Sequence, residues 1–335
     1  MRPYLIWNEN GGRLMNRFRN ILVVADAASA TDALFARARW LAEANGATLT
    51  LVDIIDTAPG DFARLFSALP GMRAREVEDR VIGFHADRLD TLAEPLRSEG
   101  LNVRTQVFQG VGFIETIRAV LANGHDLVLK GAQRTPESRT LRGPDLHLLR
   151  KCPCPVWLLN STTEPNARRI MAAVDPDPSD PVRDGLNHMV MELATSLCVH
   201  DGARLDVVNA WQLEEEQTLR HSFVNMPEPE IQAILDKCER DSASGLKKLM
   251  DDFTAFAQNT RVLHVKGVPA DVLIEHADRE RIDTLVMGTL ARTGIAGLFI
   301  GNTAETVLNR LDCSVLTVKP RGFVSPVQLA EGTKA

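Results

Sequence analysis

The sequence predicts an α/β protein made of two tandem domains, each built on a doubly wound parallel sheet. Three observations predict this fold: a set of strand-like segments occurs twice in the same order, those segments are continuously apolar, and helical patterns separate them. The length of 335 residues suits two domains of ordinary size. An apolar content of 44% with 24% charged residues is typical of a globular chain with sizeable cores.

The repeat is visible in matched landmarks from the two halves of the chain. "RNILVVADAA" at 19–28 pairs with "RRIMAAVDPD" at 168–177, which sets Asp26 opposite Asp175. Three further pairs follow in the same order: 47–56 with 203–212, 125–131 with 282–288, and 154–160 with 313–319. Four landmarks in one order indicate the duplication of one ancestral domain.

The segments between the landmarks predict the layout of each half. The strands are short and apolar on both faces, which indicates a buried parallel sheet. "TDALFARARWLAEANG" predicts a helix that begins at the capping residue Thr31 and stops at Gly46. The segments 113–124 and 269–281 have the same helical spacing and lie in the third crossover of each half. Strand and helix alternate, so each half is predicted to be Rossmann-like or flavodoxin-like.

The joint between the halves is predicted in "NSTTEPNAR", a polar, proline-containing segment at 160–168. The expected organisation is an N-terminal extension at 1–16, a first domain at 17–160, a second domain at 168–320 and a C-terminal tail at 321–335.

Composition excludes several classes of function. A net charge of −6 gives no electrostatic support for binding a polyanion, so no direct nucleic-acid binding is expected. No apolar run approaches the roughly 18 residues of a membrane span, and the first residues lack the apolar region of a secretion signal. Five scattered cysteines suit a reducing compartment better than a disulfide framework. We therefore expect a cytoplasmic protein with no membrane partner.

Ligands of open parallel sheets bind beyond the carboxyl ends of the strands, where the winding reverses. Three matched pairs of residues end the predicted strands: Asp26 and Asp175, Asp53 and Asn209, Gly131 and Gly288. Each residue is expected to face the crevice of its own half. A turn or helix cap explains the carboxylates equally well.

The stretch "GTLARTGIAGLFIGNTAE" at 288–305 is the strongest candidate for a phosphate loop. Gly288 follows a strand and Gly301 precedes a helix, which would let backbone N–H groups approach phosphate oxygens. Against this, Asn302 and Glu305 fit an N-x-x-E capping pattern, and no lysine follows the glycine, so the stretch is not a P-loop. Both interpretations, a phosphate loop and a turn with a capped helix, stay open on these residues.

The paired first strands, together with "GTLARTGIAGLFIGNTAETVLNRLDCSVLTVKP" at 288–320, resemble the universal stress protein family in its tandem two-domain, E-type form. In the first half, "NGHDLVLK" and "HLLRKCPCPVW" support the same match, and the resemblance covers about residues 17–328. It implies a cytoplasmic stress-response protein that supports resistance to stress such as DNA-damaging agents, without strong catalytic activity.

The family's nucleotide signature is G-x-x-G-x9-G-(S/T), and this chain departs from it. Gly288 and Gly301 match two of its positions, whereas Ala291 stands at the second glycine and Asn302, followed by Thr303, at the hydroxyl position. In the first half of the chain, the second glycine position holds an arginine, Arg134, in a charged, shorter loop that looks unfit for a triphosphate.

If ATP with Mg²⁺ binds anywhere, the resemblance therefore implies the C-terminal crevice. There Asp175 and the backbone around Ala210 and Met287 would contact ribose and adenine, and Arg292 is the nearest candidate positive charge. No cofactor is expected to be required. Two alternatives to the stress-response reading stay open: an ATP-binding module or slow ATPase using this crevice, and an interaction scaffold without a ligand.

Assembly and metal binding complete the expectations. The resemblance implies that single-domain relatives pair through their last strands; here 154–160 and 313–319 supply both strands, so an internal pseudo-dimer is expected. A homodimer is the further assembly to test. His147, Cys152 and Cys154 lack the spacing of a zinc site, and no metal is expected.

Overall fold

The computed structural model describes residues 6–7, 13–14, 18–26, 31–56, 74–134, 140–160, 167–221, 226–289 and 301–329. Near the N-terminus, β1 (Ile6–Trp7) pairs antiparallel with β2 (Arg13–Leu14). All other described strands belong to one ten-stranded sheet.

Strands and helices alternate in the first half. Its elements are β3 (Asn20–Val24), α1 (Asp32–Asn45), β4 (Thr48–Ile55), α3 (Ala74–Ser98), β5 (Val103–Gln109), α4 (Gly112–Asn123), β6 (Leu127–Gly131), α5 (Gly143–Lys151) and β7 (Val156–Leu159). The five strands are parallel and lie in the order β7-β6-β3-β4-β5.

The second half repeats this arrangement. Its elements are β8 (Arg169–Ala173), α6 (Pro181–Asp201), β9 (Arg204–Trp211), α7 (Glu216–His221), α8 (Glu228–Asp251), the 3-10 helix η1 (Thr254–Asn259), β10 (Thr260–Lys266), α9 (Pro269–Glu280), β11 (Thr284–Gly288), α10 (Asn302–Arg310) and β12 (Ser314–Val318). The strand order is β10-β9-β8-β11-β12. In both halves the first strand lies centrally with the second and third to one side, which is the Rossmann order and not the flavodoxin order.

The predicted duplication is confirmed at the level of single positions. Asp26 and Asp175 each lie two residues beyond the first strand of their half. Gly131 and Gly288 each end the fourth strand.

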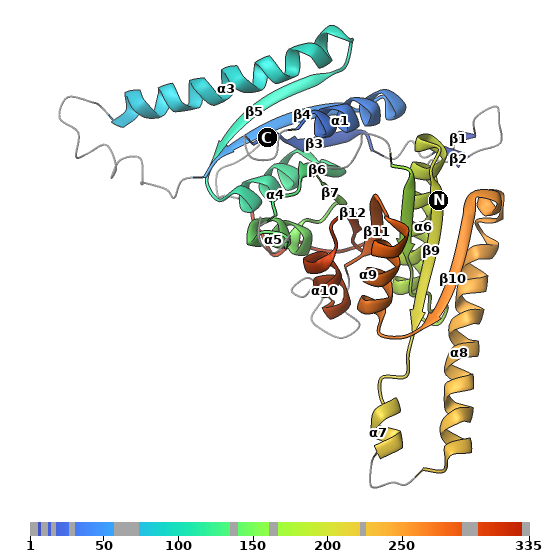
Figure 1. Cartoon of the computed structure of the whole chain (residues 1–335). Helices are drawn as coiled ribbons and strands as arrows, with labels where there is room; N and C mark the ends of the chain where they lie inside the picture. The colour runs from blue at the N-terminus through green and yellow to red at the C-terminus, as the bar shows by residue number, and fades with distance from the viewer. Residues whose placement is uncertain are drawn as a thin grey trace.

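The two halves join through their last strands. β7 and β12 pair antiparallel, with Trp157 opposite Leu316, and this pairing makes one continuous sheet of the two five-stranded halves. The predicted internal pseudo-two-fold contact is thereby confirmed. Figure 1 shows β7 and β12 at the centre of the molecule, with α3 and α8 projecting from opposite ends.

Helices cover both faces of the sheet. One buried apolar cluster lies under α1, α3, α6 and α8, and a second lies under α4, α5, α9 and α10. Each cluster draws residues from both halves, because the sheet is continuous across the junction. Within the described residues, no helix is long and apolar enough to cross a membrane.

The helix ends follow the sequence signals in most places. Thr31 accepts a hydrogen bond from the N–H of Leu34 at the start of α1, and Gly46 ends that helix in the left-handed conformation, as predicted. Gly124 and Gly202 end α4 and α6 in the same way. α9 differs, because Arg281 takes this position with φ 53° and is the single non-glycine residue with positive φ among the described residues.

Candidate functional site

The carboxyl ends of β8, β9 and β11 meet at the switch point of the second half. Ala173 of β8 lies beside Met287 on one side and Val208 on the other. Met287 and Ala210, both predicted to lie near adenine, are buried in their strands. Asp175 lies two residues beyond β8, so the fold brings these three predicted residues to the same edge of the sheet.

Asp175 is held in place and remains accessible. Its N–H donates to Asn187 Oδ1 at 2.8 Å, and its carboxylate accepts a hydrogen bond from Arg183 Nη2 at 2.6 Å. The Asp175 side chain is 47% exposed. Arg183 thus places a positive charge at the crevice that the sequence interpretation did not include. The sequence feature that could have revealed Arg183 is Asp180, because this residue caps α6 and thereby places Arg183 in the first turn of the helix.

Gly288 has a packing role that needs no ligand. A Cβ atom added here would lie 2.6 Å from Leu186 Cδ2 in α6. Glycine therefore allows α6 to pack closely over the end of β11. This contact explains why glycine stands at that position, whether or not a phosphate approaches.

Gly301 is the N-cap of α10, with φ −62° and no side-chain capping bond. The predicted capping box is wrong, because Asn302 is already the first helical residue and the Glu305 carboxylate pairs with Arg150 of α5. The Glu305 side chain, which the local pattern assigned to the helix cap, instead makes a contact across the domain junction. Asn302 is exposed and Thr303 is half-buried. Ala291 and Arg292 lie outside the described residues.

The matching crevice of the first half is filled by an internal ion-pair cluster. Lys130 Nζ lies 3.0 Å from Asp145 Oδ1 and 3.7 Å from Asp26 Oδ2. The N–H of Gln133 donates to Asp145 Oδ2 at 2.7 Å, and burial raises the pKa of the Asp145 carboxyl. Asp26, which is predicted to face this crevice, therefore lies near Lys130, a residue that the sequence analysis did not include in the site.

Asp53 is closed off in the same half. Its carboxylate is 1% exposed, and the Oδ2 atom lies 2.5 Å from His85 Nδ1 and 2.6 Å from Arg88 Nη2. Both partners come from α3. Arg134, assigned to the phosphate loop of this half, instead donates to the carbonyl oxygen of Cys313 at 3.1 Å. The Arg134 guanidinium therefore forms a hydrogen bond between the two halves of the chain.

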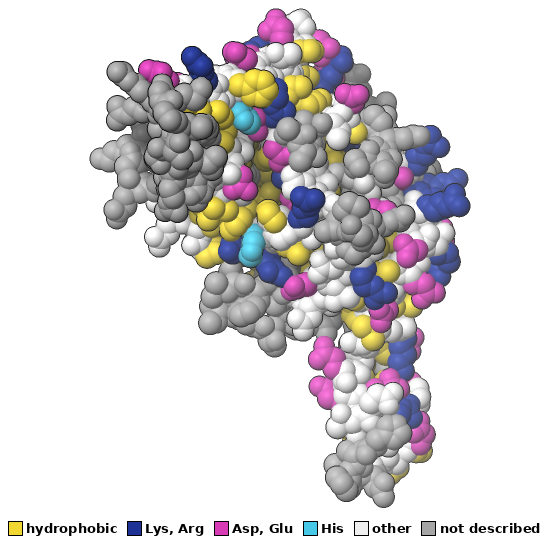
Figure 2. All heavy atoms as spheres, turned by 60° about the vertical axis from the view of Figure 1, so that its left-hand side comes forward, with side chains coloured by type: hydrophobic (Ala, Val, Ile, Leu, Met, Phe, Trp, Pro, Cys, Tyr) yellow, Lys and Arg dark blue, Asp and Glu magenta, His cyan; other side chains and the backbone are white. Residues whose placement is uncertain are grey.

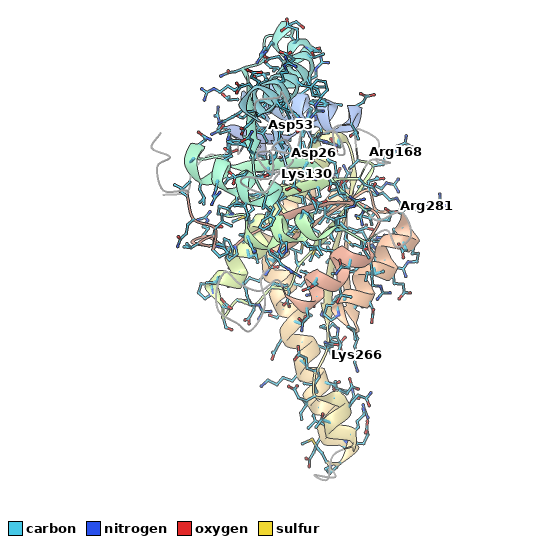
Figure 3. The ribbon with its side chains drawn as sticks, turned by 90° about the vertical axis from the view of Figure 1, so that its left-hand side faces the viewer. Asp26, Asp53, Lys130, Arg168, Lys266 and Arg281 are labelled. Carbon is cyan, nitrogen blue, oxygen red and sulfur yellow. The ribbon has the colours of Figure 1, made fainter. Side chains whose placement is uncertain are left out.

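The two crevices differ in their chemistry. Counted from the ends of matching elements, Met287 stands at the position of Lys130 and Ala304 at the position of Asp145. Both residues are apolar and buried. The second half therefore has apolar residues at the two positions where the first half has the ion pair. Figure 3 labels Asp26, Asp53 and Lys130 close together at the ends of the first-half strands.

A serine and a histidine meet beside Asn209, a pairing that the spacing of the sequence does not reveal. Ser242 Oγ donates to Asn209 Oδ1 at 2.9 Å, while Asn209 Nδ2 donates to the carbonyl oxygen of Val174 at 3.0 Å. The single hydroxyl proton of Ser242 is thus directed to Asn209. His264 Nε2 lies 3.1 Å from Ser242 Oγ. These contacts join α8 to the neighbouring strands β9 and β10.

The cysteine and histidine positions show no metal site. Cys152 Sγ and Cys154 Sγ are 3.6 Å apart, and the His147 ring stacks on Phe113 with 4.8 Å between centroids. Across the described ranges, no group of three or more His, Cys, Asp or Glu side chains could hold a metal ion.

The fold and the two unequal crevices define a duplicated Rossmann-like α/β protein, whose two halves are joined by the pairing of their last strands. The model of the Universal stress protein family matches residues 17–160 and 166–319, so the chain belongs to that family, in its tandem two-domain, E-type form.

Relatives match over nearly the whole chain. Universal stress protein E of Escherichia coli (strain K12) is 28% identical over 322 residues, covering 94% of this chain and 98% of the relative. Universal stress protein E of Photorhabdus laumondii is 25% identical over 322 residues, covering 95% and 100%. Because coverage is nearly complete on both sides, the similarity includes both halves and their order.

Solved structures show the same fold. A functionally unknown protein from Pseudomonas aeruginosa PAO1 superposes with a TM-score of 0.66 at 23% identity, covering 91% of this chain and 94% of that chain. A universal stress protein from Archaeoglobus fulgidus superposes with a TM-score of 0.57 at 14% identity, covering 89% and 98%.

Proposed function

We propose that this chain is a cytoplasmic stress-response protein that supports resistance to DNA-damaging agents without strong catalytic activity. The observation that carries this proposal is the single ten-stranded sheet, in which both halves match the family. Two polar groups that already have partners support the absence of strong catalytic activity: the Lys130 ammonium group pairs with Asp145, and the Ser242 hydroxyl donates to Asn209.

The test is survival after damage. Deleting the gene is expected to lower survival after treatment with a DNA cross-linking agent, and an uninterrupted copy supplied in trans is expected to restore it. Unchanged survival of the deletion strain across cross-linking, oxidant and starvation treatments would contradict the proposal.

For the ligand, we infer that any ATP binds the crevice of the second half. The specific observation is the contrast between Lys130 with Asp145 in the first half and the apolar pair Met287 and Ala304 in the second. Asp175 would face the ribose. The phosphates would lie at the start of α10, near the backbone of Gly301, Asn302 and Thr303.

Charge at the start of α10 sets the expected affinity. Glu305 lies in the first turn and would compete with a phosphate for the helix dipole. Its pairing with Arg150 offsets part of that repulsion. Because Ala291 and Asn302 replace a glycine and a hydroxyl residue of the family signature, we expect weak, millimolar-range binding.

Melting measured against increasing ATP and Mg²⁺ tests this inference, because a ligand of the native state alone raises the melting temperature. Asp175→Ala and Gly301→Val are expected to abolish the increase. Asp26→Ala, the matched change in the first half, is expected to leave it intact. An increase that survives both second-half variants and disappears in Asp26→Ala would place the ligand in the other crevice. No increase for the unaltered protein would favour the ligand-free scaffold.

A further inference from the structure

A second cavity lies at the opposite end of the second-half strands. It has a volume of about 350 Å³ and is open to solvent. Its lining residues come from the amino ends of β8 and β11 and the end of α9: Arg168, Arg169, Arg279, Glu280, Arg281 and Asp283. In Figure 3, Arg168 and Arg281 lie near one another at one edge of the molecule, far from Lys266 at the carboxyl end of β10. We call this group the arginine cavity.

The two carboxylates of the arginine cavity are already engaged. Asp283 Oδ2 accepts the backbone N–H groups of Arg168 and Arg169, both at 2.8 Å. Glu280 pairs with Arg169 through one oxygen, and its other oxygen lies 3.2 Å from Arg261, outside the cavity lining. Arg279 lies 3.7 Å from Glu280 and 3.9 Å from Glu275. Four arginines and two carboxylates thus line the cavity. Arg281 is exposed and has no ion pair with any carboxylate in the described part of the chain.

Arg281 stands where the backbone prefers glycine. Its φ of 53° is left-handed, a conformation that crowds the Cβ atom of any residue other than glycine. Gly46, Gly124 and Gly202 occupy the same helix-ending position in α1, α4 and α6. An arginine kept against this local preference points to a role for its side chain.

The first half shows that the fold itself needs neither Arg169 nor Arg281 at these positions. Asp126 accepts the N–H groups of Arg19 and Asn20, at 2.6 and 3.1 Å, as Asp283 does for Arg168 and Arg169. The backbone device is therefore present in both halves. In the first half, Asn20 and Gly124 stand at the positions of Arg169 and Arg281. The positive charges of Arg169 and Arg281 are therefore specific to the second half.

We propose that the arginine cavity binds a small anion bearing phosphate groups. Guanidinium groups donate paired hydrogen bonds that match phosphate oxygens, and several of them around one cavity can hold more than one phosphoryl group. A small ligand fits better than a nucleic acid, because the chain carries a net charge of −6 and Figure 2 shows basic side chains interspersed with acidic ones. This site is separate from the nucleotide crevice and does not depend on it.

The test uses the full chain, with inorganic phosphate, pyrophosphate and ATP as separate probes in titration calorimetry at low ionic strength. Pyrophosphate is expected to bind more tightly than phosphate, since it can span more guanidinium groups. Arg281→Gly restores the residue that the other helices use, so it is expected to fold at least as well as the unaltered chain. It should nevertheless weaken pyrophosphate binding by about tenfold. Adding Arg168→Gln is expected to abolish binding.

Arg19→Gln is the matched control, because Arg19 holds the position of Arg168 in the first half; it should leave pyrophosphate affinity unchanged. Gly301→Val should also leave pyrophosphate affinity unchanged while reducing any binding of ATP in the nucleotide crevice. The proposal is overturned if the unaltered chain does not bind pyrophosphate at millimolar concentration. It is also overturned if binding survives the double arginine change, or if Gly301→Val alone removes it.

Discussion

The Lys319 ammonium group is buried just beyond β12, with the residue 8% exposed. Its Nζ donates to Thr289 Oγ1 and lies 5.0 Å from the centre of the Phe323 ring. Burial lowers the pKa of Lys319 from 10.5 to about 8. The unfolded chain therefore binds more protons than the folded chain between about pH 8 and 10.5, and the stability of the folded chain rises with pH across this window.

Lys319→Met is expected to stabilise the protein near neutral pH. Methionine has a side chain of similar length to lysine but carries no charge. The gain in the free energy of unfolding should be about 1–2 kcal/mol, after subtraction of the lost hydrogen bond to Thr289. The gain should shrink as the pH rises from about 8 toward 10.5 and above, because the folded chain has then released this proton and the unfolded chain is losing it as well. Urea unfolding of both proteins across this pH range measures the difference, and a gain independent of pH would contradict the assignment to buried charge.

At the scale of elements, α6 packs on β11 through a contact between Leu186 and Gly288, whereas its neighbour Gly185 takes no part in this contact. A Cβ atom added at Gly288 would clash with Leu186, whereas a Cβ atom added at Gly185 would meet nothing within 4 Å. Substitution of the two glycines should therefore have opposite effects on stability. One permits a close contact between elements, and the other sits in a helix interior with nothing against it.

Gly288→Ala is expected to destabilise the protein by about 1–3 kcal/mol, because Leu186 or the helix must shift to admit the methyl group. Gly185→Ala should instead stabilise it by about 0.5–1 kcal/mol through helix propensity. Chemical denaturation of the two variants provides the comparison. Equal stability of the two variants would show that α6 moves freely over the strand.

At the scale of the whole molecule, a buried ion pair joins the two halves beside the β7–β12 pairing. Arg37 of α1 contacts both carboxylate oxygens of Asp201 in α6 at 2.9 Å, and the two side chains are 4% and 1% exposed. The guanidinium also lies over Trp157 of β7, 5.0 Å from the ring centre. Asp201 further accepts the N–H of Ala167, at the start of the second half.

Arg37→Met is expected to cost about 3–5 kcal/mol, because it leaves the Asp201 carboxylate buried without its partner. Adding Asp201→Asn should recover part of this loss, since the uncompensated charge is then gone. Thermal and urea unfolding of both single variants and the double variant measure the coupling. Strictly additive losses would mean that the pair does not act as a unit across the junction.

Features that depend on local pattern could be predicted before the fold was known. Apolar runs and helical spacing predicted the alternating elements, and the matched landmarks predicted the duplication that sets Asp26 and Asp175 in equivalent places. The left-handed end of α1 at Gly46 also follows from local conformational preference. The contact between 154–160 and 313–319 was implied by the family resemblance and could not be read from periodicity.

The pairing of polar side chains, in contrast, depends on how the whole chain folds. Lys130 lies within an apolar strand pattern and gives no sequence sign that it will pair with Asp145. Glu305 has the spacing of a helix cap, yet it pairs with Arg150 across the junction. The physical reason is that hydrophobic periodicity is set by near neighbours, whereas a buried charge must find its partner wherever the folded chain brings one. For the same reason, the closed crevice of the first half and the arginine cavity of the second became visible only in the folded chain.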